Sequence, residues 1–254
     1  MNCQLGRWLA GFFGVLMSTG SLAMEFHNNT LKVGYGTSGG EPYEILNDRG
    51  ELISGINYDL GKKIARELGK TPLFYPMPVL RADAMLSSGT VEILCLYNPA
   101  FLASPEEYYW SDPFFKQTEV FIVPSPVQLN SRDQLSGLSI GAHLGYHYHP
   151  ETMKLFSDAR ASRIDREDSD TLYDLLSLGR LGALIDTRVA FDYRMKKHKQ
   201  QSQFVLKQSD LIDAEYDLYC ALSQKSLLPL DSLNQALRKL VDAGEIASVF
   251  DRYR

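Results

Sequence analysis

The alternation of strand-like and helix-like segments is the feature that most constrains how this chain can fold. "TLKVGYG" (30–36) predicts a strand, "GINYDLGKKIARELGK" (55–70) a helix and "TPLFYPM" (71–77) a second strand. A short helix in "RADAMLSSG" (81–89) and an apolar strand in "VEILCLY" (91–97) complete the unit. Strands that alternate with helices predict a parallel sheet with right-handed crossover connections.

The longer of these helices carries the clearest periodicity. Its apolar residues recur at every fourth position and would form one buried stripe, made of Ile56, Leu60, Ile64 and Leu68. Gly69 follows the stripe directly and is a typical helix stop signal.

The same order of segments begins again in the second half of the chain. A helix opened by Ser169 or Asp170 is expected there, and the tail is expected to be helical. The segments are a strand in "LSIGAHLG" (138–145), a helix in "PETMKLF" (150–156), a strand in "ASRIDRE" (161–167), a helix in "SDTLYDLLSLG" (169–179), a strand in "GALID" (182–186) and helices over 230–253.

Two small α/β units of similar design are therefore expected, joined by the extended run "QTEVFIVP" (117–124). Two such lobes side by side leave a cleft between them. Ligands of open α/β sheets bind beyond the carboxyl ends of the strands. The turns after "VGYG", "LCLY", "AHLG" and "ALID" are the places where binding residues are expected. The segments 117–124 and 215–223 should lie next to each other as the two connections between the lobes.

The first 23 residues have the features of a cleaved signal peptide. Arg7 gives the N-terminal region a positive charge, and residues 8–17 form a short apolar run. Ser21, Leu22 and Ala23 then form the small-x-small pattern of a cleavage site. The apolar run is about half as long as the roughly 20 residues a spanning helix needs. We therefore expect export to the periplasm. The formal net charge of −5 argues against nucleic acid or an anionic membrane as the main partner.

Two cysteines remain in the expected mature chain, Cys95 and Cys220. Export would permit a disulfide. Both residues sit in strand-like runs, where buried free cysteines are equally common. The sequence does not decide between the two states, and the interpretation favoured here is free thiols.

Six stretches, in order, resemble those of one protein family. They are "GINYDLGKKIARELG", "MLSSGTVEI", "WSDPFF", "DQLSGLSIGAHLG", "GRLGALIDTRVA" and "LRKLVDAGEIASVFDRY". Together they resemble the solute-binding proteins that serve polar amino-acid ABC importers, known as extracellular solute-binding protein family 3. The resemblance implies a two-lobe, type II periplasmic-binding-protein fold with the ligand cleft between lobes. It implies a monomer that binds a small molecule and passes it to an ABC permease in the inner membrane.

The resemblance also implies domain boundaries. The signal peptide would cover 1–23 and the first part of lobe I 24–117. Lobe II would cover 118–217, and the chain would return to lobe I over 218–254.

The segment "ASPEEYYWSDPFF" (103–115) departs from the family pattern. The family places an Arg about six residues before the aromatic of its Phe-Ser-x-Pro motif, where it holds the α-carboxylate of an amino acid. Counting back from Trp110 reaches Ser104, so this carboxylate clamp is missing. The segment is still expected to line the cleft mouth. Asp186, by contrast, stands where the family keeps the carboxylate that pairs with a ligand ammonium.

These comparisons give the candidate ligand-binding residues. Asp186 would pair with the ammonium group of a ligand, although it could instead cap the helix that follows it. Arg81 could replace the missing clamp or could be an ordinary surface residue. The remaining candidates are aromatic or polar residues in turns after strands: Glu41, Tyr43, Tyr97, Asn98, Tyr146, His147 and Tyr148.

No cofactor or metal is expected. The spacing of His143, His147 and His149 fits no zinc pattern. The sequence has no nucleophile–base or phosphate-loop motif, so an enzyme is not expected. Two alternatives stay open: an exported dehydratase-like enzyme of the same fold, which could use His147 with Glu41, and an orphan binding protein that acts as a sensor in trans.

Overall fold

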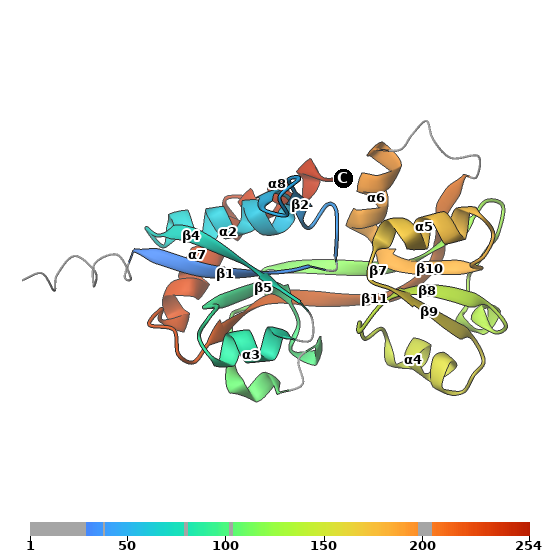
Figure 1. Ribbon diagram of the computed structural model, residues 1–254, viewed down its shortest axis with the longest axis horizontal. Coiled ribbons are helices and arrows are strands. Elements are labelled where there is room, and N and C mark those ends of the chain that lie inside the picture. The colour runs from blue at the N-terminus through green and yellow to red at the C-terminus, as the bar shows by residue number, and fades with distance from the viewer. Residues whose placement is uncertain (1–28, 38, 79–80, 102–103, 198–204) are drawn as a thin grey trace, which may run out of the picture.

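The computed structural model describes residues 29–37, 39–78, 81–101, 104–197 and 205–254 (Figure 1). The predicted signal peptide, residues 1–23, lies outside these ranges. Two α/β lobes lie side by side and are joined by two long strands, β7 and β11. Across the described residues, no helix combines the length and the apolar character needed to cross a membrane.

Lobe I is built on three parallel strands in the order β4 (Thr71–Met77), β1 (Thr30–Gly36) and β5 (Ile93–Tyr97). β4 contains Pro72 and Pro76, which cannot donate backbone hydrogen bonds. The strand can tolerate them because it lies at the edge of the sheet. A hairpin of β2 (Ile45–Leu46) and β3 (Leu52–Ser54) connects β1 to the first long helix.

The helices of lobe I cover both faces of this sheet (Figure 1). α2 (Ile56–Glu67) buries Ile56, Leu60 and Ile64 as predicted, and the chain leaves the helix at Gly69, whose φ is +65°. α7 (Leu230–Asp242) and α8 (Glu245–Arg252) pack beside α2, so the tail completes the core of lobe I. α3 (Ala82–Ser87) packs in a separate apolar cluster.

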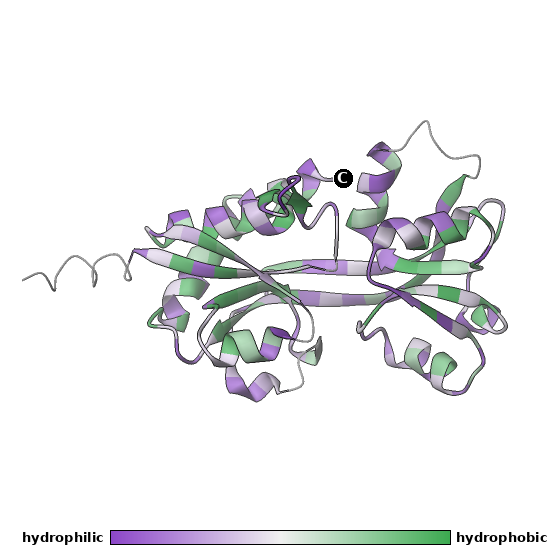
Figure 2. Ribbon diagram, viewed as in Figure 1, coloured by the Kyte–Doolittle hydropathy of each residue, from purple (hydrophilic) through white to green (hydrophobic). Residues whose placement is uncertain are grey.

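Lobe II repeats the design, with parallel strands β10 (Ala183–Thr187), β8 (Ser139–His143) and β9 (Ser162–Arg166). Its helices are α4 (Pro150–Ser157), α5 (Ser169–Ser177) and α6 (Arg188–Lys197). α5 begins at Ser169, as predicted, and Asp168 before it is the N-cap. The backbone of Asp168 is extended, and its carboxylate accepts the N–H groups of Asp170 and Thr171. Apolar residues concentrate in the central strands β5 and β10 (Figure 2).

The two crossing strands, β7 (Phe115–Pro124) and β11 (Leu206–Ser223), pair with each other in antiparallel register. Tyr216 lies opposite Gln117, and Glu215 opposite Thr118. The prediction that 117–124 and 215–223 are adjacent is therefore confirmed. Both predicted lobe boundaries fall inside these strands, and where the chain is best divided stays a prediction.

The segment after β5 forms two short 3-10 helices, Pro99–Phe101 and Pro105–Glu107, and then strand β6 (Tyr108–Trp110), which pairs with β11. A further 3-10 helix, Arg132–Leu135, leads into lobe II.

Cys95 and Cys220 form a disulfide, so the interpretation as free thiols is wrong. Cys95 lies on β5 and Cys220 on β11, and these strands are neighbours in the sheet. The two residues are 125 positions apart in the chain. Only the long-range pairing of the strands brings them together, and the local pattern around each cysteine does not contain that information.

Candidate ligand-binding site

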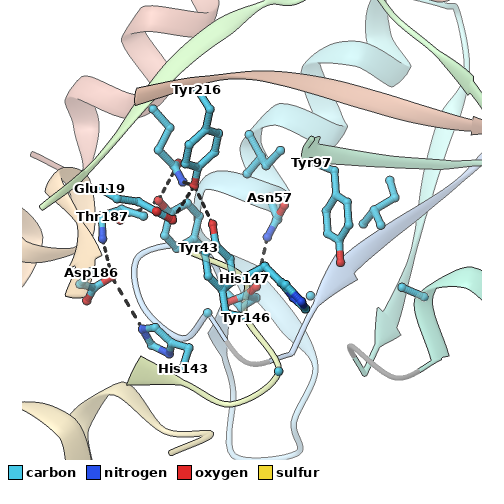
Figure 3. A pocket seen from close by; sticks show the side chains of 18 of the residues that line it. Tyr43, Asn57, Tyr97, Glu119, His143, Tyr146, His147, Asp186, Thr187 and Tyr216 are labelled. Carbon is cyan, nitrogen blue, oxygen red and sulfur yellow. Dashed lines mark hydrogen bonds and ion pairs between the residues drawn. The ribbon is translucent and has the colours of Figure 1, made fainter. Parts of the chain in front are cut away.

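A cavity of about 170 Å³ lies between the lobes. Its walls come from the carboxyl ends of β1 and β5 in lobe I, from the ends of β8 and β10 in lobe II, and from both crossing strands. Figure 3 shows polar side chains from these elements turned toward one another, with Tyr97 on the opposite side from Asp186. The cavity therefore lies where the strand-end rule places a ligand.

Six of the nine predicted residues line this cavity. They are Tyr43, Tyr97, Tyr146, His147, Tyr148 and Asp186. Each follows a strand of one of the two parallel sheets or ends it, as the sequence indicates.

The other three candidates have different roles. Glu41 pairs with Lys197 at the outer rim of the lobes. The amide of Asn98 donates to the carbonyl of Asp217 at 2.9 Å and so ties the end of β5 to β11. Arg81 is exposed just before α3, and only the next residue, Ala82, reaches the cavity wall. Arg81 therefore does not replace the missing carboxylate clamp in this conformation.

The expectation for the segment 103–115 is wrong over its described residues, 104–115. None of them lines the cavity. Instead, Tyr108 donates its hydroxyl to the carbonyl of Asp83, and the indole N–H of Trp110 donates to the carbonyl of Pro105 at 2.9 Å. Pairing of β6 with β11 holds the segment against its own lobe.

Several polar cavity residues were missed by the sequence analysis: Glu44, Asn57, Gln117, Glu119, His143, Thr187 and Tyr216. Signals for two of them exist. Glu119 is a charged residue directly before the apolar run "VFIVP", and Glu44 directly follows Tyr43 in the same turn. The crossing strands pass along the cleft, so their middle residues reach the cavity as well as the strand ends.

Glu44 is a buried carboxylate of lobe I. Its Oε1 accepts a hydrogen bond from Asn57 Nδ2 at 3.2 Å, whereas Oε2 is buried and has no hydrogen-bond partner. Burial raises the pKa of Glu44 to about 8, and the hydrogen bond from Asn57 and the nearby backbone of Gly40 only partly offset it.

The turn that carries Glu44 is fixed by its contact with the start of α2. Gly55 has a φ of +109°, and a Cβ at this position would lie 2.6 Å from the carbonyl oxygen of Tyr43. Only glycine can take this conformation at this distance. The close contact holds Tyr43 and Glu44 at the cavity wall.

A network of hydroxyl and amide groups crosses the cavity from lobe I to lobe II. The hydroxyl of Tyr43 lies 2.9 Å from Gln117 Oε1 and 2.8 Å from Thr187 Oγ1 (Figure 3). Gln117 Nε2 donates to the hydroxyl of Tyr216, which donates in turn to Glu119 Oε1 at 3.0 Å. Tyr146 joins the network through a 2.7 Å contact with Tyr216.

Glu119 is the carboxylate at the centre of this network. It is only 3% exposed. Burial raises its pKa to about 7, although hydrogen bonds from Tyr146 and Tyr216 favour its charged form. The nearby charges of Asp213 and Asp186 add to the increase.

Asp186 and His143 form the third charged element, at the ends of β10 and β8. Asp186 accepts hydrogen bonds from the hydroxyl of Tyr173 at 3.1 Å and from the N–H of Thr187 at 2.7 Å. Its Oδ1 lies 3.8 Å from Nε2 of His143. Burial alone would lower the pKa of His143, but Asp186, with the charges of Glu119 and Asp168, outweighs burial and raises it.

Asp186 does not cap the helix that follows it. Thr187 Oγ1 accepts the N–H of Ala190 at 3.2 Å and so serves the first turn of α6. Asp186 is therefore left facing the cavity.

The aromatic loop after β8 is anchored by Arg163. Its guanidinium donates to the carbonyls of His143 and Tyr146, at 3.0 and 2.9 Å, and lies over the ring of Tyr148. The N–H of His143 donates to the hydroxyl of Tyr148 at 2.8 Å. These contacts fix the loop that carries three of the predicted residues.

Charge is distributed unequally in the cavity. Its lining includes three carboxylates and two histidines, and no Lys or Arg is present among the described lining residues. The lobe I wall is more apolar, with Met77, Leu94 and Leu96 beside Tyr97. Within the part of the chain that the structure describes, no group of three or more His, Cys, Asp or Glu residues could hold a metal ion.

The sequence of the chain was compared with models of known protein families. The model of the bacterial extracellular solute-binding proteins, family 3, matches residues 31–254, nearly all of the chain that follows the predicted signal peptide. The chain belongs to this family. The two-lobe fold and the resemblance inferred from the six sequence stretches are thereby confirmed.

One distant relative of this family 3 protein comes from Neisseria gonorrhoeae. A "Probable histidine-binding protein" of Neisseria gonorrhoeae is 20% identical over 213 residues, which cover 84% of this chain and 78% of that protein.

Solved structures of similar fold include an ancestral arginine-binding protein bound to arginine. Its TM-score is 0.72 at 21% identity, with coverage of 89% of this chain and 98% of that one. Another is an amino-acid-binding ancestor described as a precursor of cyclohexadienyl dehydratase. Its TM-score is 0.70 at 18% identity, with coverage of 91% and 97%. At these identities the likeness establishes the fold alone.

Proposed function

We propose that this protein captures a small amine-bearing organic cation in the periplasm and delivers it to an ABC permease. The observation that carries the proposal is the charge of the cavity, which has three carboxylates and no Lys or Arg among its described lining residues. A ligand ammonium would supply the counter-charge that the buried Glu44 and Glu119 lack, and it would add to the one that His143 can offer Asp186.

The same cavity disfavours ordinary α-amino acids as ligands. Their α-carboxylate would be buried beside other carboxylates without a guanidinium to pair with it. Burying an unpaired charge costs several kcal/mol in real proteins. Each 1.4 kcal/mol is a tenfold change in affinity, so amines without a carboxylate should bind far more tightly.

Lobe closure supports the proposed capture mechanism. The lobes touch directly through the Tyr43–Thr187 contact at 2.8 Å and the hydrogen bond from Ser169 Oγ to the carbonyl of Gly39 at 3.3 Å. At the rim, Lys197 pairs with Glu41. A ligand that contacts both lobes would favour this closed arrangement over an open one.

An exported enzyme of the same fold is the second candidate function. One solved structure of similar fold is described as a precursor of cyclohexadienyl dehydratase, and Glu44 and Glu119 have raised pKa values suited to proton transfer. A dehydratase acting on a carboxylate substrate would need a cation to hold it. The described cavity lining has no Lys or Arg for that purpose, so binding is the function proposed.

Matched pairs of ligands test the proposal directly. Thermal shift and calorimetry would compare arginine with agmatine, lysine with cadaverine, histidine with histamine, and tyrosine with tyramine. In at least one pair, the decarboxylated member should bind at least about tenfold more tightly. Equal or tighter binding of every amino acid would overturn the proposal, and so would a panel in which no amine binds.

Localisation has its own test. If the chain is exported through a cleaved signal peptide, protein isolated from the periplasm should begin near Met24 when its intact mass is measured. A soluble protein that retains residues 1–23 would contradict export by this route. Cross-linking of the monomer to an inner-membrane permease would test its delivery role.

A further inference from the structure

Two polar atoms that line the cavity are buried and have no partner. One is Oε2 of Glu44 and the other is Nδ1 of His143. Buried polar atoms are almost always hydrogen-bonded, so each exception calls for an explanation. Both residues line the cavity, and they belong to opposite lobes, Glu44 between β1 and β2 and His143 at the end of β8.

Glu44 can only accept hydrogen bonds when it is ionised. Asn57 occupies its Oε1, which leaves Oε2 for another donor. Among the described residues of the cavity wall there is no Lys or Arg that could fill this role. An ammonium or guanidinium N–H of a ligand would satisfy Oε2 and supply its missing counter-charge.

His143 offers a second acceptor through its neighbour. Asp186 Oδ1 lies 3.8 Å from Nε2 and therefore favours a proton on that nitrogen. In the neutral imidazole, Nδ1 is then the acceptor. The carboxylate of Asp186 behind the ring adds negative charge, so this pair can receive an N–H from a cation.

We infer that Glu44 of lobe I and His143 of lobe II are the two poles of the ligand site, and that the solute is an organic dication whose two amine-type ends bridge them. The inference rests on the proposed function and specifies the substrate class of the same cavity. The apolar and aromatic residues of the cavity wall, among them Leu96 and Tyr97, would pack against the methylene chain of the ligand. Bridging places one end of the solute on each lobe, so it stabilises the closed form.

The other groups that face these poles are consistent with a doubly charged ligand. Glu44 is surrounded by Tyr35, Tyr43 and Asn57 and by no cation among the described residues. His143 faces Asp186, with the charges of Glu119 and Asp168 nearby. Apart from Arg163, which donates to the backbone carbonyl of His143, the charged groups around the two poles are acidic. One positive charge on the ligand would therefore leave the cavity negative.

A comparison of diamines with monoamines tests the bridge without any mutation. The probes are cadaverine against pentylamine and putrescine against butylamine, measured by calorimetry on the mature protein. Loss of one amine should weaken binding at least about tenfold in the better-binding pair. A monoamine that binds as tightly as its diamine overturns the two-pole site.

The wild-type protein also provides a pH test. A bound dication requires Glu44 ionised and His143 neutral, so its affinity should rise with pH. Cadaverine should bind at least about tenfold more weakly at about pH 6 than at about pH 8.5, and protons should be released on binding. Constant affinity over this range would contradict the assignment of both poles.

Variants then identify the poles. Glu44→Gln and His143→Ala should each weaken cadaverine binding by about tenfold or more. Glu51→Gln is the matched control, because Glu51 is exposed in the same lobe and outside the cavity. Thermal melting would confirm that each variant is folded, and an unfolded variant leaves the two wild-type tests decisive.

The results of these binding experiments distinguish a failure of the dication bridge from a failure of the proposed amine-binding function. If histamine or tyramine binds and no diamine does, the dication bridge is wrong and the amine-binding function stands. If a diamine binds and Glu44→Gln keeps its affinity, the assignment of the poles is wrong. If no amine binds at all, the proposed function itself fails.

Discussion

Two regions of this molecule combine acidic and aromatic side chains, and the structure uses them in opposite ways. In the segment 104–115, Glu106 and Glu107 are exposed, and Tyr109 is 50% exposed. In the cavity, Glu44, Glu119 and Asp186 are 7%, 3% and 6% exposed and are surrounded by tyrosines. The first region is contiguous in sequence, whereas the second is assembled from both lobes and both crossing strands.

The difference shows what gives a carboxylate a binding role. Water solvates the exposed acids of the segment, so they need no counter-charge from the protein or from a ligand. Burial removes that solvation in the cavity, which raises the pKa values of Glu44 and Glu119. A contiguous run of acidic and aromatic residues, such as 104–115, therefore indicates less about ligand binding than the burial of a few acidic residues that are far apart in the sequence.

The largest expected contrast between the two regions is in the pH dependence of stability. The pKa values of Glu44 and Glu119 are raised in the folded state, to about 8 and about 7, so the folded protein binds more protons than the unfolded chain above about pH 4.5. The free energy of unfolding should therefore fall by several kcal/mol as the pH rises from about 5 to about 8.5.

Denaturant titrations at several pH values would measure this decline. Glu44→Gln should remove a large part of it, while Glu106→Gln in the exposed segment should leave it unchanged. Equal slopes in the wild type and Glu44→Gln would mean that Glu44 is not a buried, proton-binding group.

The second contrast concerns ligand affinity. Asp186→Asn should weaken an amine ligand more than about tenfold, because the neutral amide no longer supplies negative charge behind His143. The double variant Glu106→Gln/Glu107→Gln should change affinity less than about twofold. Calorimetry with the amine that binds best would measure both. An unchanged affinity in Asp186→Asn would remove Asp186 from the site.

A third, smaller contrast lies in the contacts between lobes. Tyr43→Phe removes the hydroxyl that faces both Gln117 and Thr187, and should lower the free energy of unfolding by about 1 kcal/mol. Small-angle scattering should show a more open average shape for this variant if the contact holds the lobes together. An unaltered scattering profile and melting curve would show that the contact contributes little.

The smallest expected effect comes from the exposed segment itself. Tyr109→Phe should change the free energy of unfolding by less than about 0.5 kcal/mol, as surface substitutions generally do. The hydroxyl of Tyr108 donates to the carbonyl of Asp83, so Tyr108→Phe in the same strand is a useful positive control. A large loss in Tyr109→Phe would mean that the segment has a partner surface.

The sequence predicts the fold well because its signals are local. The apolar stripe of α2 and the glycine after it specify a helix and its end, and six motifs in order indicate the family. Cavity residues that end strands, such as Asp186 and Tyr97, were predicted for the same reason. Tyr216, on a crossing strand, was not predicted, because a strand interior gives no local sign of facing a cleft. Glu119, on the other crossing strand, was also missed, although its charge beside an apolar run is a local signal.

Residues that use their polar groups elsewhere could not be recognised from sequence. Asn98 follows β5 as a ligand-binding residue should, but the carbonyl of Asp217 takes its amide. Glu41 is beside the cavity turn, yet Lys197 pairs with it. Both partners are more than a hundred residues away, so the choice between ligand and protein depends on the tertiary structure.

The disulfide between β5 and β11 has a consequence for how the molecule responds to proteolysis. Every described helix and strand of lobe II lies between Cys95 and Cys220. Lobe II is therefore part of a covalently closed ring whose ends are both fixed in the sheet of lobe I. A protease that cleaves once within lobe II should yield a single band on a non-reducing gel and two fragments only after the disulfide is reduced.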